Sequence, residues 1–191
     1  GDGLIRDISA HRRHAVFNGN PTWAGDALTP AESPVYFDGT GDYALTPITW
    51  NYNGPVTVSF WNYVSGNVGG SAFGDKPNTG DNDFNNARSF QAHVPYTNGT
   101  LYWDYGDVTG NGRLSTSYSG YTGKWTHVVL TSEGVYGSGM GIYLDGTLAA
   151  SSGVSGGPAS YNLAFALGSR ATNPTDNEHT GYITAFGLHR R

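Results

Sequence analysis

The sequence contains no cysteine, which excludes disulfide bonds and metal sites built from thiolates. Charged residues are scarce, at 13% of the chain, and lysine and arginine together number only 10. The net charge of −5 and the pI near 5.5 argue against a nucleic-acid partner, because a phosphate backbone requires a basic face. No window approaches the roughly 18 apolar residues of a membrane-spanning helix, so we expect no membrane insertion.

Helix-forming residues are also few. The chain is poor in Lys, Glu and Leu, and no stretch longer than about ten residues repeats its apolar positions with the helical period. Its 29 glycines and 13 tyrosines, with abundant Thr and Val, are typical of strands joined by tight turns. We therefore predict an all-β chain.

One domain accounts for all 191 residues, because the sequence shows no internal repeat, linker or change of composition. The chain stops abruptly at LHRR, so we expect residues 1–191 to be a single domain cut from a larger protein. The first residues lack the apolar core of a signal peptide, and we expect any export signal to lie outside this chain.

Strand patterns recur at the spacing of a β-sandwich. The clearest is PVTVSFWNYV, in which Val56, Val58 and Phe60 form one wholly apolar face. The predicted strands occupy residues 55–64, 124–132, 163–169 and 181–189. Because Trp61 and Trp125 sit in such strands, we place both in the core. The same argument predicts that His127 is a hydrogen-bonded core histidine.

Turn residues support the same architecture. Asp145-Gly146 lies between two short strands in GIYLDGTLAA, and Asn98-Gly99 does so in PYTNGTLYW. Both dipeptides can adopt the positive φ angles of a two-residue type I′ turn, so each predicts a β-hairpin. The segment YFDGTGDYALT (36–46) predicts a third hairpin with a longer loop. Long loops are expected at 65–87, 106–123 and 169–180.

Five segments resemble those of a known family and occur in the same order as in that family. They are VYFDGTGDYALTP, VTVSFWNYV, GKWTHVVLTSEG, MGIYLDGTLAAS and ITAFGLHRR. The sequence resembles laminin-G-like domains of the concanavalin A-like lectin/glucanase superfamily over roughly its whole length. Most specific is the Trp-x-His-Val-x-Leu pattern at 125–130, followed by Ile-Tyr-Leu-Asp-Gly at 142–146. The resemblance implies a two-sheet antiparallel jelly-roll sandwich, which agrees with the strand patterns. The chain has Thr184-Ala185 where many members have an acidic pair.

Glycoside hydrolysis, known among relatives on this fold, requires two carboxylates at a set separation. The sequence has three glutamates, isolated from one another at Glu32, Glu133 and Glu178. Asp81 and Asp83 alternate within a stretch of loop composition, and Asp104 and Asp107 have opposite parity along a strand. No Gly-x-Ser-x-Gly pattern appears in the strand-turn-helix context that would indicate a nucleophilic serine. We therefore predict no catalytic residues and no enzyme activity.

Calcium is the cofactor that the composition allows, because Ca²⁺ takes oxygen ligands that loops rich in Asp, Asn and Gly supply. The resemblance supports this, since several laminin-G-like relatives bind calcium near loop tips. The predicted structural calcium ligands are Asp38, Asp42, Asp75, Asp81 and Asp83. Asp176 with Glu178 is a further place that qualifies. The alternative is that these side chains only stabilise turns through hydrogen bonds to the local backbone.

Aromatic residues concentrate in HVPYTNGTLYWDYGD (93–107). As a strand, this segment puts Trp103 on the larger apolar face, which we predict to be core, and Tyr102 with Asp104 on the other face. Sugar recognition combines an aromatic ring with polar groups for the hydroxyls. The candidate ligand-binding residues are Trp50, Tyr52, Tyr102, Asp104, Tyr118 and Tyr121. Packing is the alternative explanation for each ring.

Two functions from different classes remain open at this point. The first is a non-catalytic recognition or adhesion module, displayed on a cell or virion surface, that binds a glycan or a protein through its loops or its concave face. The second is a structural module whose partners are neighbouring subunits, such as a phage capsid decoration, a fibre domain or an adhesin spacer. A glycoside hydrolase is a third hypothesis, which the scattered carboxylates disfavour.

Overall fold

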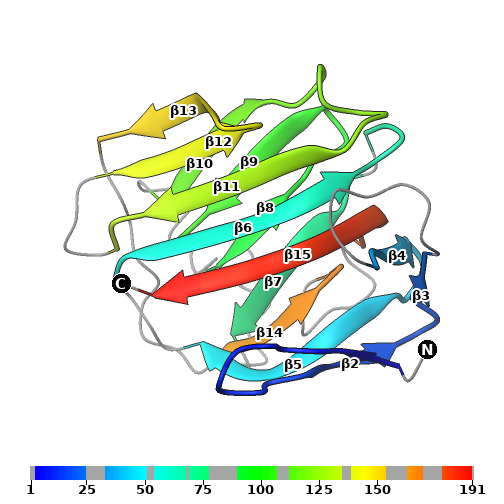
Figure 1. Cartoon of the computed structure of the whole chain (residues 1–191). Helices are drawn as coiled ribbons and strands as arrows, with labels where there is room; N and C mark the ends of the chain where they lie inside the picture. The colour runs from blue at the N-terminus through cyan, green and yellow to red at the C-terminus, as the bar shows by residue number, and fades with distance from the viewer. Residues whose placement is uncertain are drawn as a thin grey trace.

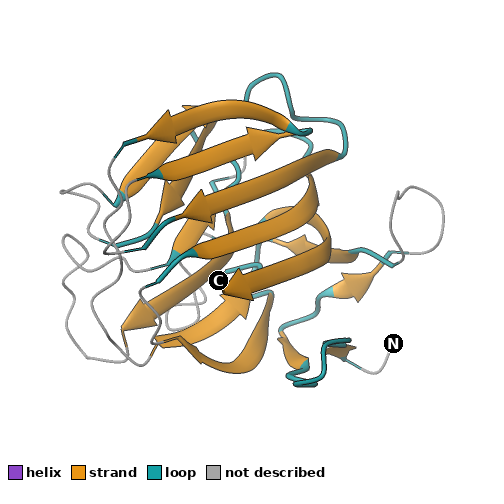
Figure 2. Cartoon of the chain, turned by 60° about the vertical axis from the view of Figure 1, so that its left-hand side comes forward, coloured by secondary structure: helices purple, strands orange, loops and turns teal. Residues whose placement is uncertain are grey.

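The computed structural model is a sandwich of two antiparallel β-sheets (Figure 1). It describes residues 3–24, 33–50, 54–67, 69–77, 90–106, 112–134, 139–153, 163–169 and 178–190. Strands dominate these residues and no helix occurs among them (Figure 2), which confirms the prediction of an all-β sandwich. The described chain contains no helix long and apolar enough to cross a membrane.

The sheet at the back of Figure 1, which we call sheet A, has eight strands. In hydrogen-bonded order they are β1 (Leu4–Ile5), β2 (Ala15–Asn18), β5 (Tyr43–Trp50), β14 (Leu163–Leu167), β7 (Ser71–Pro77), β8 (Gln91–His93), β9 (Thr100–Asp104) and β10 (Arg113–Ser117). Strands β7 to β10 follow one another along the chain, whereas β14 inserts between β5 and β7. Sheet A is therefore assembled from distant parts of the sequence.

The front sheet, sheet B, has seven strands. In hydrogen-bonded order they are β13 (Thr147–Ser152), β12 (Met140–Leu144), β11 (Thr126–Ser132), β6 (Val56–Tyr63), β15 (Thr180–Arg190), β4 (Val35–Asp38) and β3 (Thr22–Trp23). The two strongest sequence patterns, β6 and β11, pair directly, with His127 opposite Trp61. Together with β15 they form the centre of this sheet.

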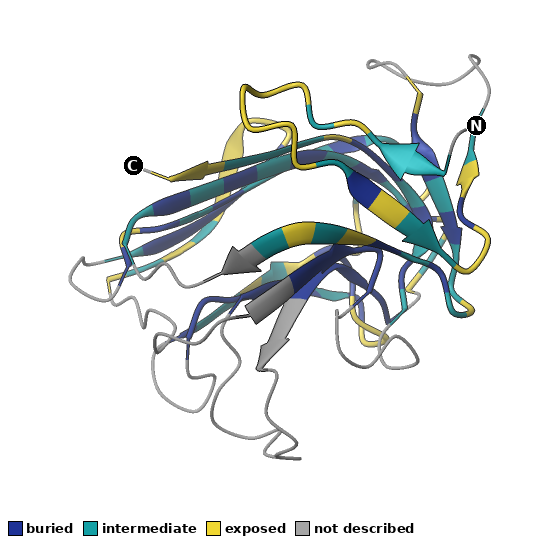
Figure 3. Cartoon of the chain, turned by 90° about the horizontal axis from the view of Figure 1, so that it is seen from below, coloured by how far each residue is buried: buried dark blue, intermediate teal, exposed yellow. Residues whose placement is uncertain are grey.

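The core lies between the two sheets, and strand alternation determines which side chains enter it. On β6, Val56, Val58 and Phe60 are buried while the residues between them are half-buried. Sheet A supplies Phe73, on β7, and Trp103, on β9, to the same core. The indole Nε1 of Trp103 donates a hydrogen bond of 3.0 Å to the carbonyl of Thr131 in sheet B. Figure 3 shows the two layers with buried positions along both.

Trp61 and Trp125 do not lie in the core, contrary to the sequence prediction. Both are half-buried, and Trp61 is on the face of β6 opposite to Phe60. The face of β6 with Val56, Val58 and Phe60 turns inward and takes Asn62 with it, because it buries three apolar side chains, so the other face carries the tryptophan outward. His127 is also half-buried on that outer face, where its ring lies 5.1 Å from that of Trp61.

The two hairpins predicted from dipeptides both form, although their turns differ. Between β12 and β13, Asp145 has φ 50° and Gly146 has φ 79°, as a type I′ turn requires. Between β8 and β9 only Gly99 has a positive φ, at 76°. The amide of Gly99 bonds to the carbonyl of Tyr96, and the amide of Tyr96 to the carbonyl of Thr100, so this loop is longer than the predicted two residues.

The third predicted hairpin, over residues 36–46, is wrong. Strand β4 pairs with β3 and β15 in sheet B, whereas β5 pairs with β2 and β14 in sheet A. The glycine-bearing loop therefore carries the chain from one sheet to the other. Two of the predicted long loops also contain strands, since β7 lies within 65–87 and β10 within 106–123. Strand β7 contains Gly, Asp, Lys and Pro, which are depleted in strands, and β10 lies in a stretch rich in Gly and Ser, so neither showed a clear strand pattern.

His179 is the most unusual core residue. It is fully buried beside β15, and neither of its ring nitrogens has a hydrogen-bond partner. Its ring meets that of Phe37 edge-on at 6.3 Å, and Gly70 packs so closely that a Cβ there would collide with the His179 backbone. Burial disfavours the imidazolium and lowers the pKa of His179 from its usual 6.5 to about 3.

This histidine predicts a loss of stability in acid. Its pKa is lower in the folded chain, so the unfolded chain binds the proton first. The contribution of the neutral His179 to the free energy of unfolding is therefore fully present above pH 6.5. Between pH 6.5 and about 3, the free energy of unfolding falls by up to about 1.4 kcal/mol per pH unit. We expect His179→Leu to flatten this acid slope in urea denaturation measured at several pH values.

A variant at the exposed His11, His11→Leu, is the control for losing an imidazole at the surface. An acid slope for His179→Leu as steep as that of the natural protein would contradict the assignment.

Candidate functional site

The candidate site lies on the face of sheet A that points away from sheet B, which we call the outer face. Along β9, Leu101 and Trp103 point into the core, so Tyr102 and Asp104 are on the outer face. The register places Arg113 of β10 opposite Asp104 on one side. On the other side, Gln91 of β8 is opposite Asp104. Three neighbouring strands thus bring polar side chains together on one surface.

Asp104 is the centre of this surface. It is fully buried, and its carboxylate accepts hydrogen bonds from two side chains. Arg113 binds it with two nitrogens, Nε at 2.6 Å from Oδ1 and Nη2 at 2.7 Å from Oδ2. Gln91 donates through Nε2 to Oδ2 at 2.7 Å. Such a two-point ion pair is strong and fixes the planes of both groups.

The ion pair sets the charge of the site. The hydrogen bond to Asp104 raises the pKa of Arg113 above its usual value, so the guanidinium remains charged at any ordinary pH. One positive and one negative charge then offset each other. The Arg113 side chain is 31% exposed and its Nη1 takes no part in the pair, which leaves donors available to a ligand.

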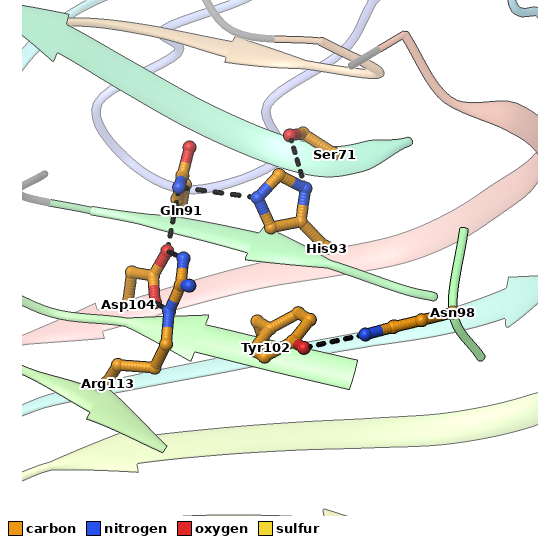
Figure 4. Close-up of polar contacts among 7 residues, drawn as sticks. All are labelled: Ser71, Gln91, His93, Asn98, Tyr102, Asp104 and Arg113. Carbon is orange, nitrogen blue, oxygen red and sulfur yellow. Dashed lines mark hydrogen bonds and ion pairs between the residues drawn. The ribbon is translucent and has the colours of Figure 1, made fainter. Parts of the chain in front are cut away.

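A chain of hydrogen bonds extends the pair towards β7 (Figure 4). The Nε2 of Gln91 lies 3.4 Å from Nε2 of His93, whose Nδ1 lies 3.2 Å from the hydroxyl of Ser71. Since the amide nitrogen can only donate, His93 accepts through Nε2 and carries its proton on Nδ1. We call Ser71, Gln91, His93, Asp104 and Arg113 the outer-face network.

Tyrosine rings border the network. The ring of Tyr102 lies beneath the guanidinium of Arg113, with 4.6 Å between the carbon Cζ and the ring centroid. Tyr96 packs edge-on against His93 at 5.1 Å and against Tyr102 at 6.0 Å. The hydroxyl of Tyr102 accepts a hydrogen bond of 2.8 Å from Nδ2 of Asn98. Tyr96 is 37% exposed, so an aromatic surface faces solvent beside the charged pair.

The loop from β8 to β9 holds these tyrosines in place. Gly99 adopts a left-handed φ that other residues avoid, and Asn98 accepts the amide of Thr100 through Oδ1 at 3.0 Å. The amide of Tyr96 bonds to the carbonyl of Thr100 at 2.8 Å. The Asn-Gly pair that indicated a hairpin in the sequence therefore also positions the exposed ring of Tyr96.

The predicted ligand-binding residues separate into different places. Tyr102 and Asp104 come together on the outer face of sheet A. Tyr118 is fully buried between the sheets, where Asn62 donates to its hydroxyl at 3.2 Å and burial raises the pKa of its phenol to about 12. Tyr121 packs on Tyr118 with Lys124 over its ring, away from the network. The side chain of Trp50, and Tyr52 entirely, lie outside the described residues.

Sequence reasoning missed most of the outer-face network. Ser71, Gln91 and Arg113 belong to strands predicted as loops or not at all, so no alternation placed them on a common face. A signal did exist: Gln91 and His93 alternate with Ala92 next to a turn, which is a short strand with a polar face. The register that brings Arg113 to Asp104 has no such signal, because it depends on the loop between β9 and β10.

The predicted calcium ligands are only partly described. Asp42 is fully buried, and its two carboxylate oxygens accept the amides of Asn20 at 2.7 Å and Asp38 at 3.0 Å. Asp38 accepts the amide of Thr40 at 2.7 Å. The bonds from the amides of Asp38 and Thr40 are the local turn-stabilising bonds of the alternative hypothesis, whereas the bond from Asn20 joins residues 22 positions apart. Within the described ranges, no three His, Asp or Glu side chains are grouped so as to hold a metal ion.

The remaining calcium predictions fall outside the described part of the chain. Asp81, Asp83 and Asp176 lie there entirely, and so does the side chain of Asp75. Glu178 is described, and its carboxylate accepts the amide of Gly41 at 2.6 Å. Calcium binding stays a prediction.

Catalytic chemistry finds little support in this geometry. Among the side chains that the structure describes, Asp104 is the one carboxylate of the outer-face network, and it is buried in an ion pair. Glycoside hydrolysis requires two carboxylates about 5 Å or more apart. Ser71 and His93 are in contact, and Nε2 of His93 lies 3.4 Å from the amide nitrogen of Gln91. Ser71, His93 and Gln91 by themselves do not make a serine triad, whose third member is an acid.

The fold and the site together define an all-β sandwich that carries a polar and aromatic patch on one outer sheet face. Residues 38–191 match a laminin-G model described as the concanavalin A-like lectin/glucanases superfamily. The chain belongs to this superfamily, as the resemblance in its sequence implied. No curated protein matches it in sequence.

Solved structures with the same fold include binding domains of botulinum neurotoxins. The serotype G domain has a TM-score of 0.69 at 13% identity, over 97% of this chain and 45% of that one. The serotype D domain solved with N-acetylneuraminic acid has 0.66 at 18%, over 96% and 44%. The DC domain solved with rat synaptotagmin II has 0.65 at 16%, over 96% and 44%. The chain thus spans less than half of each neighbour.

The network predicts strong energetic coupling between Asp104 and Arg113. Arg113→Met leaves a buried carboxylate with Gln91 as its one described side-chain donor, so we expect it to lower the free energy of unfolding by about 3 kcal/mol. Adding Asp104→Asn removes that unpaired charge, and the double variant should recover part of the loss. Urea denaturation of both single variants and the double variant measures the coupling.

Lys124→Met is the matched control, because Lys124 also lies over a tyrosine ring but has no buried carboxylate beside it. Additive losses within about 0.5 kcal/mol for the Asp104 and Arg113 variants would show that the pair is not coupled.

Proposed function

We propose that this chain is a non-catalytic recognition module that binds a glycan on the outer face of sheet A. The observation that carries the proposal is that the exposed Tyr96 and the partly exposed guanidinium of Arg113 both border the buried polar groups of the outer-face network. The core of the sandwich does not need these groups, since they point away from it. Buried polar networks on an outer face are costly to build, and a ligand gives them a use.

The chemistry of the patch suits a sugar. Pyranose rings present an apolar face that stacks on aromatic side chains, and hydroxyl groups that exchange hydrogen bonds with fixed polar groups. Tyr96 and Tyr102 supply the rings, with centroids 6.0 Å apart. Arg113 supplies donors through the nitrogen that Asp104 leaves unused. The ion pair and the hydrogen bond from Asn98 hold these groups before any ligand arrives, which lowers the entropic cost of binding.

The structural neighbours support a binding role in general. One was solved with N-acetylneuraminic acid and another with rat synaptotagmin II, so binding domains with this fold occur with a glycan and with a protein. For this chain we favour the glycan, because the patch combines tyrosine rings with fixed hydrogen-bonding groups. A protein ligand on the same face is the alternative.

A non-catalytic role fits the superfamily, whose description includes glucanases as well as lectins. For glycoside hydrolysis, Asp104 would have to supply a proton or act as a nucleophile. The two-point contact with Arg113 already occupies both of its oxygens. We further propose that the module is displayed outside the cell, on a cell surface or a virion. A purely structural module, such as a capsid decoration or an adhesin spacer, would leave the outer-face network without a use.

Loss of the tyrosine rings should abolish most of the glycan binding. We expect Tyr96→Ala and Tyr102→Ala each to weaken binding by about tenfold, because a stacked ring contributes about 1 kcal/mol beyond its buried area. The measurement is a glycan array followed by isothermal titration with the strongest hits, with and without a calcium chelator. The chelator arm tests the calcium prediction in the same experiment.

Tyr143→Ala is the control, since Tyr143 is half-buried on strand β12 of the other sheet. Silence of the natural protein on the array would overturn the proposed function. Equal binding by the tyrosine variants would move the site elsewhere on the molecule.

A further inference from the structure

Among the residues that the structure describes, two buried side-chain amides each have a carbonyl oxygen without a hydrogen-bond partner. One is Asn62, whose Oδ1 is unpartnered between the sheets. The other is Gln91, whose Oε1 is unpartnered on the outer face, with the residue only 1% exposed. An unsatisfied buried acceptor costs about 1–3 kcal/mol, so each such group in a native structure calls for an explanation.

The orientation of the Gln91 amide is determined by its neighbour. The atom 2.7 Å from Oδ2 of Asp104 must be the nitrogen, because an ionised carboxylate only accepts hydrogen bonds. The oxygen therefore points away from Asp104 and from His93, as Figure 4 shows. Turning the amide over would place two acceptors, Oε1 of Gln91 and Oδ2 of Asp104, in contact.

On the strands next to Gln91, the residues in register with it are small. Its register partner on β7 is Gly74, and the partner of Gly74 on β14 is Ala166. Neither side chain can donate a hydrogen bond, and neither extends further from the sheet than a methyl group. The unpartnered oxygen therefore stands at the border between the polar network and a row of small residues, diagonally next to Tyr102.

We propose that Oε1 of Gln91 is the acceptor that selects the ligand of this site, and that the ligand is a neutral oligosaccharide. The inference rests on the proposed function and deepens it. A hydroxyl group or an acetamido N–H of the sugar donates to Oε1 while the ring stacks against the tyrosines. An acidic sugar gains little, because Asp104 already offsets the charge of Arg113. A ligand that lacks a hydrogen-bond donor at this position would leave the buried acceptor unpaired, so the site discriminates against such ligands.

The test uses Gln91→Met, which keeps the length of the side chain and removes the acceptor Oε1 together with the hydrogen bond from Nε2 to Asp104. The probes are lactose, N-acetyllactosamine, cellobiose and sialyllactose, titrated into the whole chain. We expect a neutral member of the panel to bind more tightly than sialyllactose. We expect Gln91→Met to weaken that neutral ligand by about tenfold or more, as for one lost hydrogen bond.

Asn62→Leu is the matched control. It removes the other unpartnered amide oxygen, but from the core, where Nδ2 donates to the carbonyl of Val94 and the hydroxyl of Tyr118. We expect it to lower stability and to leave affinity within about twofold. Thermal unfolding of both variants confirms that the titrated protein is folded.

The outcomes separate the two proposals. If the tyrosine variants lose binding while Gln91→Met does not, the role of Gln91 is wrong and the glycan site stands. Tighter binding of sialyllactose overturns the neutral ligand class, and a structure of the complex with only water on Oε1 overturns the contact. If no probe and no array glycan binds, the proposed function fails and this inference fails with it.

Discussion

Aromatic packing between the sheets is the interaction on which the other features depend. The ring of Phe73 in sheet A lies 5.2 to 6.0 Å from those of Phe60, Phe90, Trp103 and Phe165, which come from both layers. These rings bury large apolar areas and set the distance between the sheets. Because side chains alternate along a strand, each ring that points inward assigns its neighbours to the outer face. The position of Trp103 thereby places Tyr102 and Asp104 on the surface where the outer-face network forms.

The network differs in kind from the other buried polar groups. His179 is neutral, and Asn62 makes its two described hydrogen bonds within the core, so both are consistent with structural roles. The outer-face network instead combines a buried charge, a partly exposed arginine and an exposed tyrosine. A buried ion pair contributes little net stability compared with apolar residues of the same shape, because its desolvation offsets its attraction. Under the proposed function, the ion pair contributes a fixed geometry for the ligand and not net stability.

The prediction from sequence succeeded where local pattern and local packing agree. The hairpin at Asp145-Gly146, the alternation of β6 and the core position of Trp103 depend on adjacent residues, and all were predicted. It failed where distant segments compete for the same position. Trp61 was expected in the core, yet the opposite face of its own strand, with Val56, Val58 and Phe60, is the one that is buried. The segment 36–46 has the composition of a hairpin, but its strands pair in different sheets, a choice that β14 and β15 determine from the other end of the chain.

The sequence by itself therefore determined the class of fold, the family and two members of the candidate site, Tyr102 and Asp104. These follow from period-two alternation and from the resemblance of whole segments, which are properties of contiguous residues. Only the tertiary structure decided that Arg113 and Gln91 meet Asp104, and that Tyr118 is core. Those contacts follow from strand register across loops, and register depends on how the whole sheet packs, because a shift of one residue would turn each side chain to the opposite face.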